Sequence, residues 1–176
     1  QRSDSHALLL LPLTAAHPLD AAVYSVWGQK HNEERRMDAL TYCLVVEELA
    51  RVCPSTAVTL SVSNSVCCWP ISRFGSAGLK RAVLPELASG GAIGGFGLTE
   101  PGSGSDAASM KATARRDGSD WILDGEKAWI TNAGIAKWYV VLAKTDPAAG
   151  KRGISAFVVG ADWPGLAVGA AEDKLG

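Results

Sequence analysis

The spacing of the apolar residues changes near residue 91, and this change constrains the fold more than any other feature of the 176-residue chain. Before it, the spacing is helical. Across residues 37–52 apolar side chains recur every three or four positions, with charged residues on the opposite face. This pattern predicts an amphipathic helix, which ends at Pro54 because proline has no amide hydrogen and clashes with the preceding turn.

Two further helices are expected before the change. Ser55 can cap one that runs to about Cys68, with Pro70 as the break that follows it. Ser76 can cap the other, which Pro85 is expected to interrupt and which ends at a Ser-Gly-Gly sequence.

After residue 91 the pattern is typical of strands. Short apolar runs or alternating residues are separated by glycine, proline and aspartate. A hairpin is expected around the turn Asp124–Gly125. The expected strands are 92–98, 110–115, 121–123, 126–131, 139–144, 154–159 and 166–170.

Helices followed by strands predict an α+β protein rather than an alternating β-α-β chain. We expect an N-terminal α-helical domain at residues 1–91 and an antiparallel β-barrel or sandwich at residues 92–176. Residues 1–36 show no clean periodicity and are predicted only to be partly helical.

Composition excludes several classes of protein. The net charge is -1 and the basic residues are scattered, so neither nucleic acid nor an anionic membrane is an expected partner. No stretch approaches the roughly 18 apolar residues of a spanning helix, so we expect a soluble chain. Four cysteines fit no zinc spacing and are expected to be buried free thiols in a reducing compartment: Cys43, Cys53, Cys67 and Cys68.

Two segments carry the chemistry. Residues 96–106 (Phe-Gly-Leu-Thr-Glu-Pro-Gly-Ser-Gly-Ser-Asp) form a glycine-rich loop after an apolar run. Residues 129–132 (Trp-Ile-Thr-Asn) place an indole beside a hydroxyl and an amide. No lysine follows the glycines, so this is not a phosphate-binding P-loop. Together the segments indicate a site for a flat, polar-edged ring with a diphosphate, as in a flavin nucleotide.

Two other interpretations of the loop remain open. Residues 102–107 match the Gly-x-Gly-x-x-Ala form of the dinucleotide fingerprint, and Asp124 lies about twenty residues further on. That fingerprint requires a helix directly after the glycines, whereas residues 110–115 alternate with period two. Glycine and serine could also form a simple surface turn.

Both segments resemble the signature segments of the acyl-CoA dehydrogenases. The similarity extends in one register over roughly residues 37–176, and it is strongest to the short-chain members. Further matching stretches are 46–50, 55–60, 73–75, 84–85, 153–157 and 172–176.

The resemblance implies a flavoenzyme that oxidises an acyl-CoA to the trans-2-enoyl-CoA, with FAD as cofactor. In that family a carboxylate removes the α proton while the β hydrogen leaves as hydride to flavin N5. The implied partners are the acyl-CoA substrate and an electron-transfer flavoprotein or similar acceptor. A homotetramer is implied for the full-length protein, in the cytoplasm or the mitochondrial matrix.

The resemblance also assigns residues to the flavin site. Thr99 would bond the edge of the ring, Thr131 would reach its N5 side, and Trp129 would pack against it. Ser105 would contact the substrate as well as the flavin. The full set expected to bind the cofactor is Phe96, Gly97, Leu98, Thr99, Glu100, Pro101, Gly102, Ser103, Gly104, Ser105, Trp129, Ile130 and Thr131.

Other residues are expected to be structural. Glu100 and Asp106 are predicted to fix the loop through hydrogen bonds rather than to act as a catalytic base. The remaining tryptophans of the second half are predicted to serve packing: Trp121, Trp138 and Trp163.

The chain departs from the family pattern at both ends. Residues 32–38 do not match the expected turn, and no residue corresponds to the catalytic glutamate, which is expected beyond Gly176. We therefore expect part of a dehydrogenase that is inactive alone and binds flavin weakly. Alternatives are an inactive flavin-binding module, or the flavin monooxygenase and nitroalkane oxidase branch of the same fold.

Overall fold

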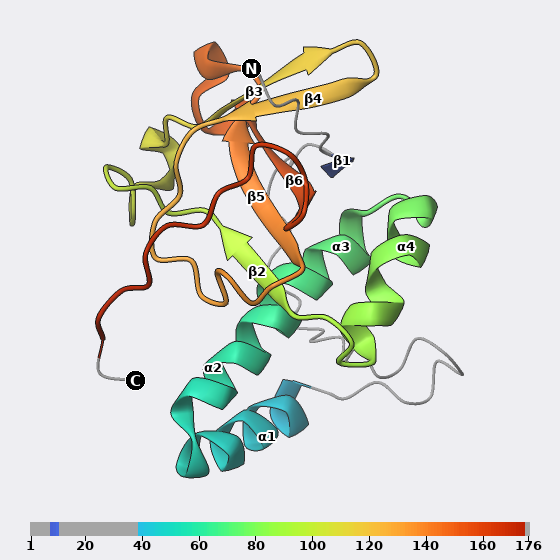
Figure 1. Ribbon diagram of the computed structural model, residues 1–176, viewed down its shortest axis with the longest axis vertical. Helices are drawn as coiled ribbons and strands as arrows, with labels where there is room; N and C mark the ends of the chain where they lie inside the picture. Colours follow the sequence, from blue (N-terminus) through green and yellow to red (C-terminus); the bar gives the residue numbers. More distant parts are fainter. Residues whose placement is uncertain (1–7, 11–38, 175–176) are drawn as a thin grey trace.

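The computed structural model describes residues 8–10 and 39–174. A helical part precedes a β-sheet part, as the change in periodicity predicts (Figure 1). The prediction for residues 1–36 falls almost entirely outside the described residues. The helices are α1 (Ala39–Val52), α2 (Pro54–Ser61), a π-helix (Val62–Cys68), α3 (Trp69–Phe74) and α4 (Ala77–Ala88).

One continuous helical run contains α2, the π-helix and α3. It begins two residues earlier than predicted, because Cys53 rather than Ser55 is at the N-cap position, and it does not break at Pro70. The amide of Trp69 donates to the carbonyl of Asn64, five residues back, so the turn before Pro70 is widened. A widened turn relieves the clash that a proline ring makes with a normal helical turn, which explains why the predicted break was wrong.

Helix α4 begins as the sequence predicts. The Ser76 hydroxyl accepts a hydrogen bond of 3.2 Å from the amide of Leu79, so it caps the helix. Pro85 lies inside the helix, which continues to Ala88, so the predicted interruption was wrong. The chain then leaves through Gly90 at φ 75°, a left-handed conformation that favours glycine.

The sheet is mostly antiparallel. Its strands run in the order β1-β6-β5-β3-β4, and β2 pairs with β5 off this path. The pairs β1–β6, β5–β6 and β3–β4 are antiparallel, whereas β2–β5 and the short β3–β5 contact are parallel. The strands are β1 (Leu8–Leu10), β2 (Gly94–Gly97), β3 (Thr113–Asp117), β4 (Asp120–Asp124), β5 (Trp138–Lys144) and β6 (Ile154–Gly160).

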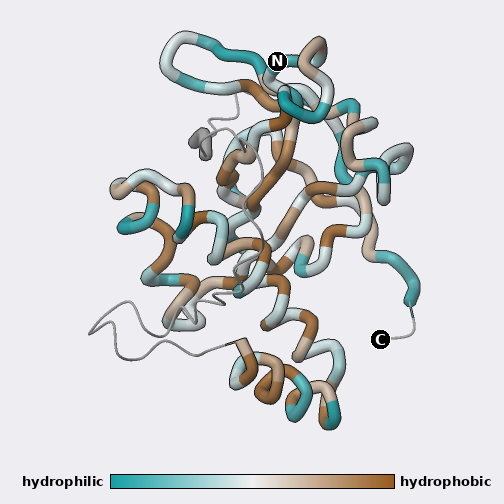
Figure 2. Tube along the Cα trace, turned by 180° about the vertical axis from the view of Figure 1, so that it is seen from behind, coloured by the Kyte–Doolittle hydropathy of each residue, from teal (hydrophilic) through white to brown (hydrophobic). Residues whose placement is uncertain are grey.

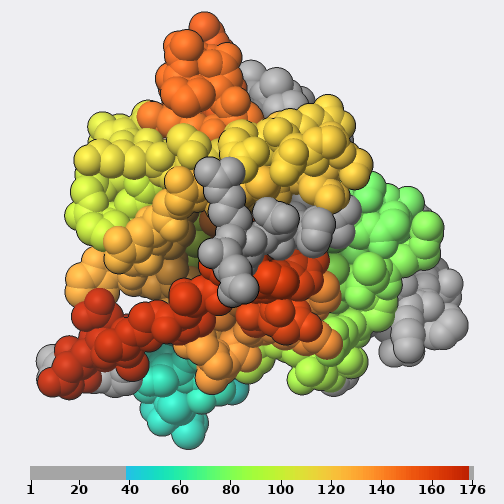
Figure 3. Space-filling view, turned by 45° about the horizontal axis from the view of Figure 1, so that its top comes forward, coloured from blue at the N-terminus to red at the C-terminus, as the bar shows by residue number. Residues whose placement is uncertain are grey.

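The hairpin lies elsewhere than predicted. Strands β3 and β4 are joined by Gly118–Ser119, with Gly118 at φ 61°, which suits a two-residue hairpin loop. Gly125 instead lets the chain pass close to Ala112, because a Cβ at Gly125 would lie 2.6 Å from the Ala112 Cβ. The strands predicted at 126–131 and 166–170 are absent, since these described residues form turns and irregular chain. Residues 164–174 run exposed along the surface (red in Figure 3).

Two apolar clusters cover the two faces of the sheet. The helices pack on one face, where Cys67, Ile71 and Val83 meet Val140 and Val158. The other face carries a smaller cluster around Phe157. The tryptophans predicted to be structural contribute edge-to-face contacts, with ring centroids 5.5 Å apart for Trp121–Phe157 and 6.3 Å for Trp138–Trp163.

The cysteine prediction was half right. All four cysteines are free, but only Cys67 and Cys68 are buried, whereas Cys43 and Cys53 are exposed. Burial raises the pKa of Cys68 to about 12, and it raises the pKa of Cys67 as well.

Helix α1 presents apolar side chains to solvent. It was predicted to be amphipathic, yet Leu40, Leu44 and Val52 are exposed, and Figure 2 shows apolar residues along this outlying helix. Within the described residues, no helix has the length and hydropathy to cross a membrane.

Candidate functional site

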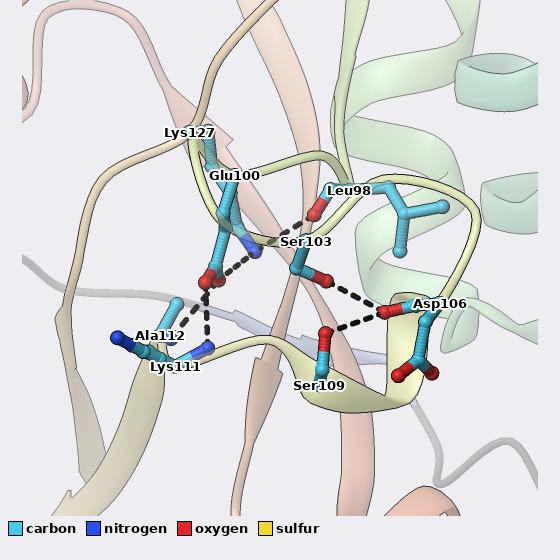
Figure 4. A network of polar contacts seen from close by, with 8 residues as sticks. All are labelled: Leu98, Glu100, Ser103, Asp106, Ser109, Lys111, Ala112 and Lys127. Atoms are coloured by element: carbon cyan, nitrogen blue, oxygen red, sulfur yellow. Dashed lines mark hydrogen bonds and ion pairs between the residues drawn. The ribbon is translucent and has the colours of Figure 1, made fainter.

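The first signature segment leaves strand β2 and folds back on itself. We call residues 98–106 the glycine loop. Two backbone hydrogen bonds join Glu100 and Ser103, with the Glu100 amide donating over 2.9 Å and the Ser103 amide over 3.1 Å. Pro101 and Gly102 therefore form an exposed tip. The hydroxyls of Ser103 and Ser109 both donate to the carbonyl of Asp106 over 2.8 Å (Figure 4).

A buried carboxylate anchors the glycine loop. Glu100 is 6% exposed and accepts hydrogen bonds from the amides of Lys111 at 2.5 Å and Ala112 at 2.9 Å. It also pairs with the ammonium of Lys127 at 2.8 Å (Figure 4). Burial alone would raise the pKa of Glu100, but these hydrogen bonds outweigh it and hold the pKa below its usual value.

The loop-fixing prediction is therefore confirmed for Glu100. In the case of Asp106, it is the main-chain carbonyl that accepts the hydrogen bonds from Ser103 and Ser109. An ionised carboxylate that accepts several hydrogen bonds is a poor base, because each bond favours its charged form.

The second signature segment lies directly beside the first. We call residues 127–136 the tryptophan turn. Lys127 donates to the carbonyl of Leu98 over 3.1 Å, and the amide of Ala128 donates to the carbonyl of Thr99 over 2.8 Å. The structure thus brings together the two segments that the sequence separates by more than twenty residues.

Trp129 is not a core residue of a strand. Its side chain is 63% exposed, and its backbone has φ 59°, a left-handed conformation that is rare for a bulky residue. An indole held in this way beside the glycine loop offers a flat apolar surface to a ligand.

Asn132 fastens the tryptophan turn to the rest of the molecule. It is buried at φ 69°, and its side-chain amide donates to the carbonyls of Gly94 at 2.9 Å and Thr59 at 3.3 Å. The hydroxyl of Ser63 accepts from the amide of Gly94 at 3.0 Å. One asparagine therefore joins the turn to both strand β2 and helix α2.

The glycines of the segment serve two different purposes. A Cβ at Gly94 would lie 2.5 Å from the Cys67 sulfur, and one at Gly95 would lie 2.6 Å from the Tyr139 ring, so packing requires glycine at both positions. At Gly102 and Gly104 a Cβ would meet nothing within 4 Å, and neither has a positive φ. The described chain gives no internal reason for these two glycines.

The predicted cofactor-binding residues differ in exposure. Gly97, Glu100 and Ser103 are buried; Phe96, Leu98, Thr99, Ile130 and Thr131 are partly buried; Pro101, Gly102, Gly104, Ser105 and Trp129 are exposed. Their contact with a ligand remains a prediction. The dinucleotide fingerprint would need a helix from residue 107, but a 3-10 turn at Ala107–Ser109 leads into strand β3 instead.

Sequence reasoning missed Lys127. A lysine between Glu126 and Ala128, two positions before the tryptophan, was the available signal. Its meaning depends on Glu100, which lies 27 positions away, so spacing alone could not reveal it.

Two family models match the chain. The model described as the acyl-CoA dehydrogenase N-terminal domain matches residues 29–91, and the model described as the acyl-CoA dehydrogenase middle domain matches residues 95–176. The chain therefore belongs to the acyl-CoA dehydrogenase family.

Individual relatives agree with this assignment. The chain is 50% identical over 140 residues to the mitochondrial short-chain specific acyl-CoA dehydrogenase of Homo sapiens, covering 80% of this chain and 34% of that protein. Butyryl-CoA dehydrogenase from Megasphaera elsdenii superposes with a TM-score of 0.79 at 38% identity, over 85% of this chain and 41% of that one. A glutaryl-CoA dehydrogenase from Mycobacterium smegmatis in complex with FADH2 superposes with a TM-score of 0.73 at 44% identity, over 79% of this chain and 35% of that one. The chain spans about a third of the length of these curated relatives.

Proposed function

We propose that this chain supplies the flavin-facing part of an acyl-CoA dehydrogenase, which binds FAD and oxidises an acyl-CoA thioester to the trans-2-enoyl-CoA. The conformation of Trp129 carries the proposal. A left-handed backbone at a bulky residue costs about 1–3 kcal/mol, and such outliers cluster at ligand sites. Here the outlier holds an indole 63% exposed beside the glycine loop.

The residues present fit an isoalloxazine ring and its diphosphate. Gly102 and Gly104 leave open backbone, so a ligand can approach closely enough to bond amides. We assign the edge of the ring to Thr99, its N5 side to Thr131 and its flat face to Trp129. Bound FAD would supply the acceptor for the hydride that leaves the acyl chain.

Each assigned residue then has a physical task. Hydroxyl and amide donors stabilise negative charge that develops at the ring, in the manner of an oxyanion hole. Trp129 excludes water from the reacting face. Ser105 contacts both flavin and substrate in this proposal, and its exposure leaves it accessible.

We further propose that the catalytic base lies outside residues 1–176. Glu100, the buried carboxylate of the glycine loop, is held by two amides and an ammonium. The domain division at residues 1–91 and 92–176, an electron-transferring flavoprotein as acceptor and a homotetrameric full-length enzyme belong to the same proposal, and they rest on family membership.

An FAD titration tests the flavin assignment. Residues 1–176 are titrated with FAD, and binding is followed by quenching of flavin fluorescence, with NAD⁺ as the competitor expected to have no effect. Trp129→Ala is expected to weaken FAD binding about tenfold, roughly the worth of one good aromatic contact. Ile135→Ala is the matched control, because Ile135 is 64% exposed in the same turn.

Weak binding is expected even for the unchanged chain, because the described residues leave Trp129 open to solvent. Flavin should therefore be lost on gel filtration. Displacement of FAD by NAD⁺, or equal losses in the Trp129 and Ile135 variants, would overturn the assignment.

A further inference from the structure

We propose that Lys127 is a positioning residue, which sets the spacing between the glycine loop and the tryptophan turn. Its role at the flavin rests on the function proposed above. The spacing itself is a property of this chain and can be tested without any cofactor.

Consecutive residues of the two segments are tied in one register. The ammonium of Lys127 donates to the carbonyl of Leu98 at 3.1 Å and to the carboxylate of Glu100 at 2.8 Å. Between these two contacts, the amide of Ala128 donates to the carbonyl of Thr99 at 2.8 Å. The lysine side chain therefore provides two of these three links between the segments.

The Lys127–Glu100 pair is shielded from water. The side chains are 12% and 6% exposed, whereas the Lys137–Glu86 pair is 51% and 34% exposed. A buried pair is weakly screened, and removing one partner leaves an uncompensated charge. An exposed pair holds its partners only weakly.

Lys127 is well placed to orient Trp129. The tryptophan lies two residues further on, in a left-handed conformation that its own preferences do not favour. Its placement must therefore come from the anchors on either side. Asn132 provides one anchor, through Gly94 and Thr59. Lys127 provides the other, through Glu100. The carboxylate of Glu100 also accepts hydrogen bonds from the amides of residues 111 and 112, which directly precede strand β3.

Amide hydrogen exchange in the cofactor-free chain tests the spacing. The Ala128 amide reports the contact between the segments, and the Val158 amide reports the core of the sheet. Lys127→Met is expected to raise the Ala128 exchange rate at least tenfold relative to that of Val158. Lys137→Met, which removes an exposed lysine that also pairs with a glutamate, should leave this ratio unchanged. Lys127→Arg should restore most of the protection.

A double variant separates positioning from simple charge compensation. Glu100→Gln with Lys127→Met leaves no uncompensated buried charge, so the chain should fold, yet it lacks the tether. In this double variant the ratio of the Ala128 exchange rate to that of Val158 should remain at least tenfold higher than in the unchanged chain. A ratio that returns to the unchanged value would overturn the proposal, as would equal acceleration of both amides in the single variant.

Bound FAD provides the second readout. The visible circular dichroism of saturating FAD should change in the double variant and not in Lys137→Met. If the chain without substitutions binds no FAD, the function proposed above is refuted. The ratio of exchange rates would still test whether Lys127 sets the spacing between the two segments. An unchanged dichroism spectrum together with altered exchange would refute the role of Lys127 at the flavin.

Discussion

Some glycines of this chain are required by core packing, whereas others leave the backbone open to a ligand. Gly94 lies against the Cys67 sulfur, which is fully buried, whereas Gly102 faces open space. We expect Gly94→Ala to lower the free energy of unfolding by about 1–3 kcal/mol, because an added methyl group overpacks the core. Gly102→Ala should change it by less than about 0.5 kcal/mol, as surface substitutions usually do. Urea denaturation measures both.

The same pair of variants separates stability from binding. Gly102→Ala should weaken FAD binding while the fold is unaffected, because the methyl group would stand where the ligand approaches the backbone. A stable Gly94→Ala variant would show that the Cys67 contact is not a tight one. Undiminished FAD binding by Gly102→Ala would remove one support for the proposed site.

Glu100 should make stability depend on pH in the acid range. Hydrogen bonds hold its folded pKa below the unfolded value of about 4.3. Its contribution is therefore complete above that pH and is lost as the pH falls through the folded pKa. Thermal melts below about pH 4.3 should show a steep loss of stability in the unchanged chain and a shallower one in Glu100→Gln.

Glu86→Gln is the matched control for the acid melts. The pKa of Glu86 is also lowered, first by its bond to Lys137, but this pair is largely exposed. Exposed pairs contribute little, so Glu86→Gln should leave the acid slope nearly unchanged. Equal slopes for the unchanged chain and Glu100→Gln would contradict the prediction.

The role of Glu100 could be predicted from sequence, because a carboxylate inside a glycine-rich loop more often fixes the loop than acts as a base. Its partner could not be predicted. Lys127 meets Glu100 only because the two segments pack together, and that packing depends on strand pairing between β2 and β5.

At the level of elements, Asn132 joins a helix, a strand and a turn. Asn132→Ala would leave the carbonyls of Thr59 and Gly94 without this donor and force alanine to φ 69°. We expect a loss of about 2–4 kcal/mol in the free energy of unfolding, from unmade hydrogen bonds and backbone strain together. Chemical denaturation provides the measurement.

Asn132→Gly divides this loss into its two causes. Glycine tolerates the left-handed conformation but cannot donate, so this variant should recover roughly 1 kcal/mol relative to alanine. If the two variants are equally stable, strain plays no part and the hydrogen bonds account for the whole effect.

Element positions were predictable where side-chain spacing decides them. The helix at 39–52, the cap at Ser76 and strands β5 and β6 follow from periodicity and capping chemistry. Pro70 and Pro85 misled the prediction because tertiary packing and a widened turn accommodate prolines that would break an isolated helix. The Asp-Gly pair at Asp124–Gly125 predicted the hairpin turn, but the turn lies at Gly118–Ser119. Glycine is needed at position 125 because the chain there passes close to Ala112.

At the level of the whole molecule, the order of helices and then strands determined the fold class, and the structure confirms it. The resemblance in the two signature segments led to the family, which the family models confirm. The exposure of Trp129 and of the apolar residues of α1 could not be read from the pattern. Amphipathic spacing shows that a face is apolar, but it does not show what covers that face.

The proposed position of the catalytic base leads to a test on the whole chain. Removal of an α proton requires a carboxylate within hydrogen-bond reach of the substrate. Glu100 already accepts bonds from two amides and an ammonium, which lower its pKa and occupy its oxygens. Residues 1–176 with added FAD, a short acyl-CoA and an electron-accepting dye should therefore show no turnover above the flavin-only blank.

The short-chain specific acyl-CoA dehydrogenase of Homo sapiens, assayed in the same way, serves as the positive control. Turnover by residues 1–176 would place the base within the chain. Glu100→Gln and Asp106→Asn would then identify it, because the variant of the true base should lose turnover while the other retains it. Loss in the Glu100 variant would mean that substrate binding breaks the Lys127 pair and frees the carboxylate. Breaking the pair would also loosen the glycine loop from the tryptophan turn, because Lys127 joins the two through Glu100 and Leu98.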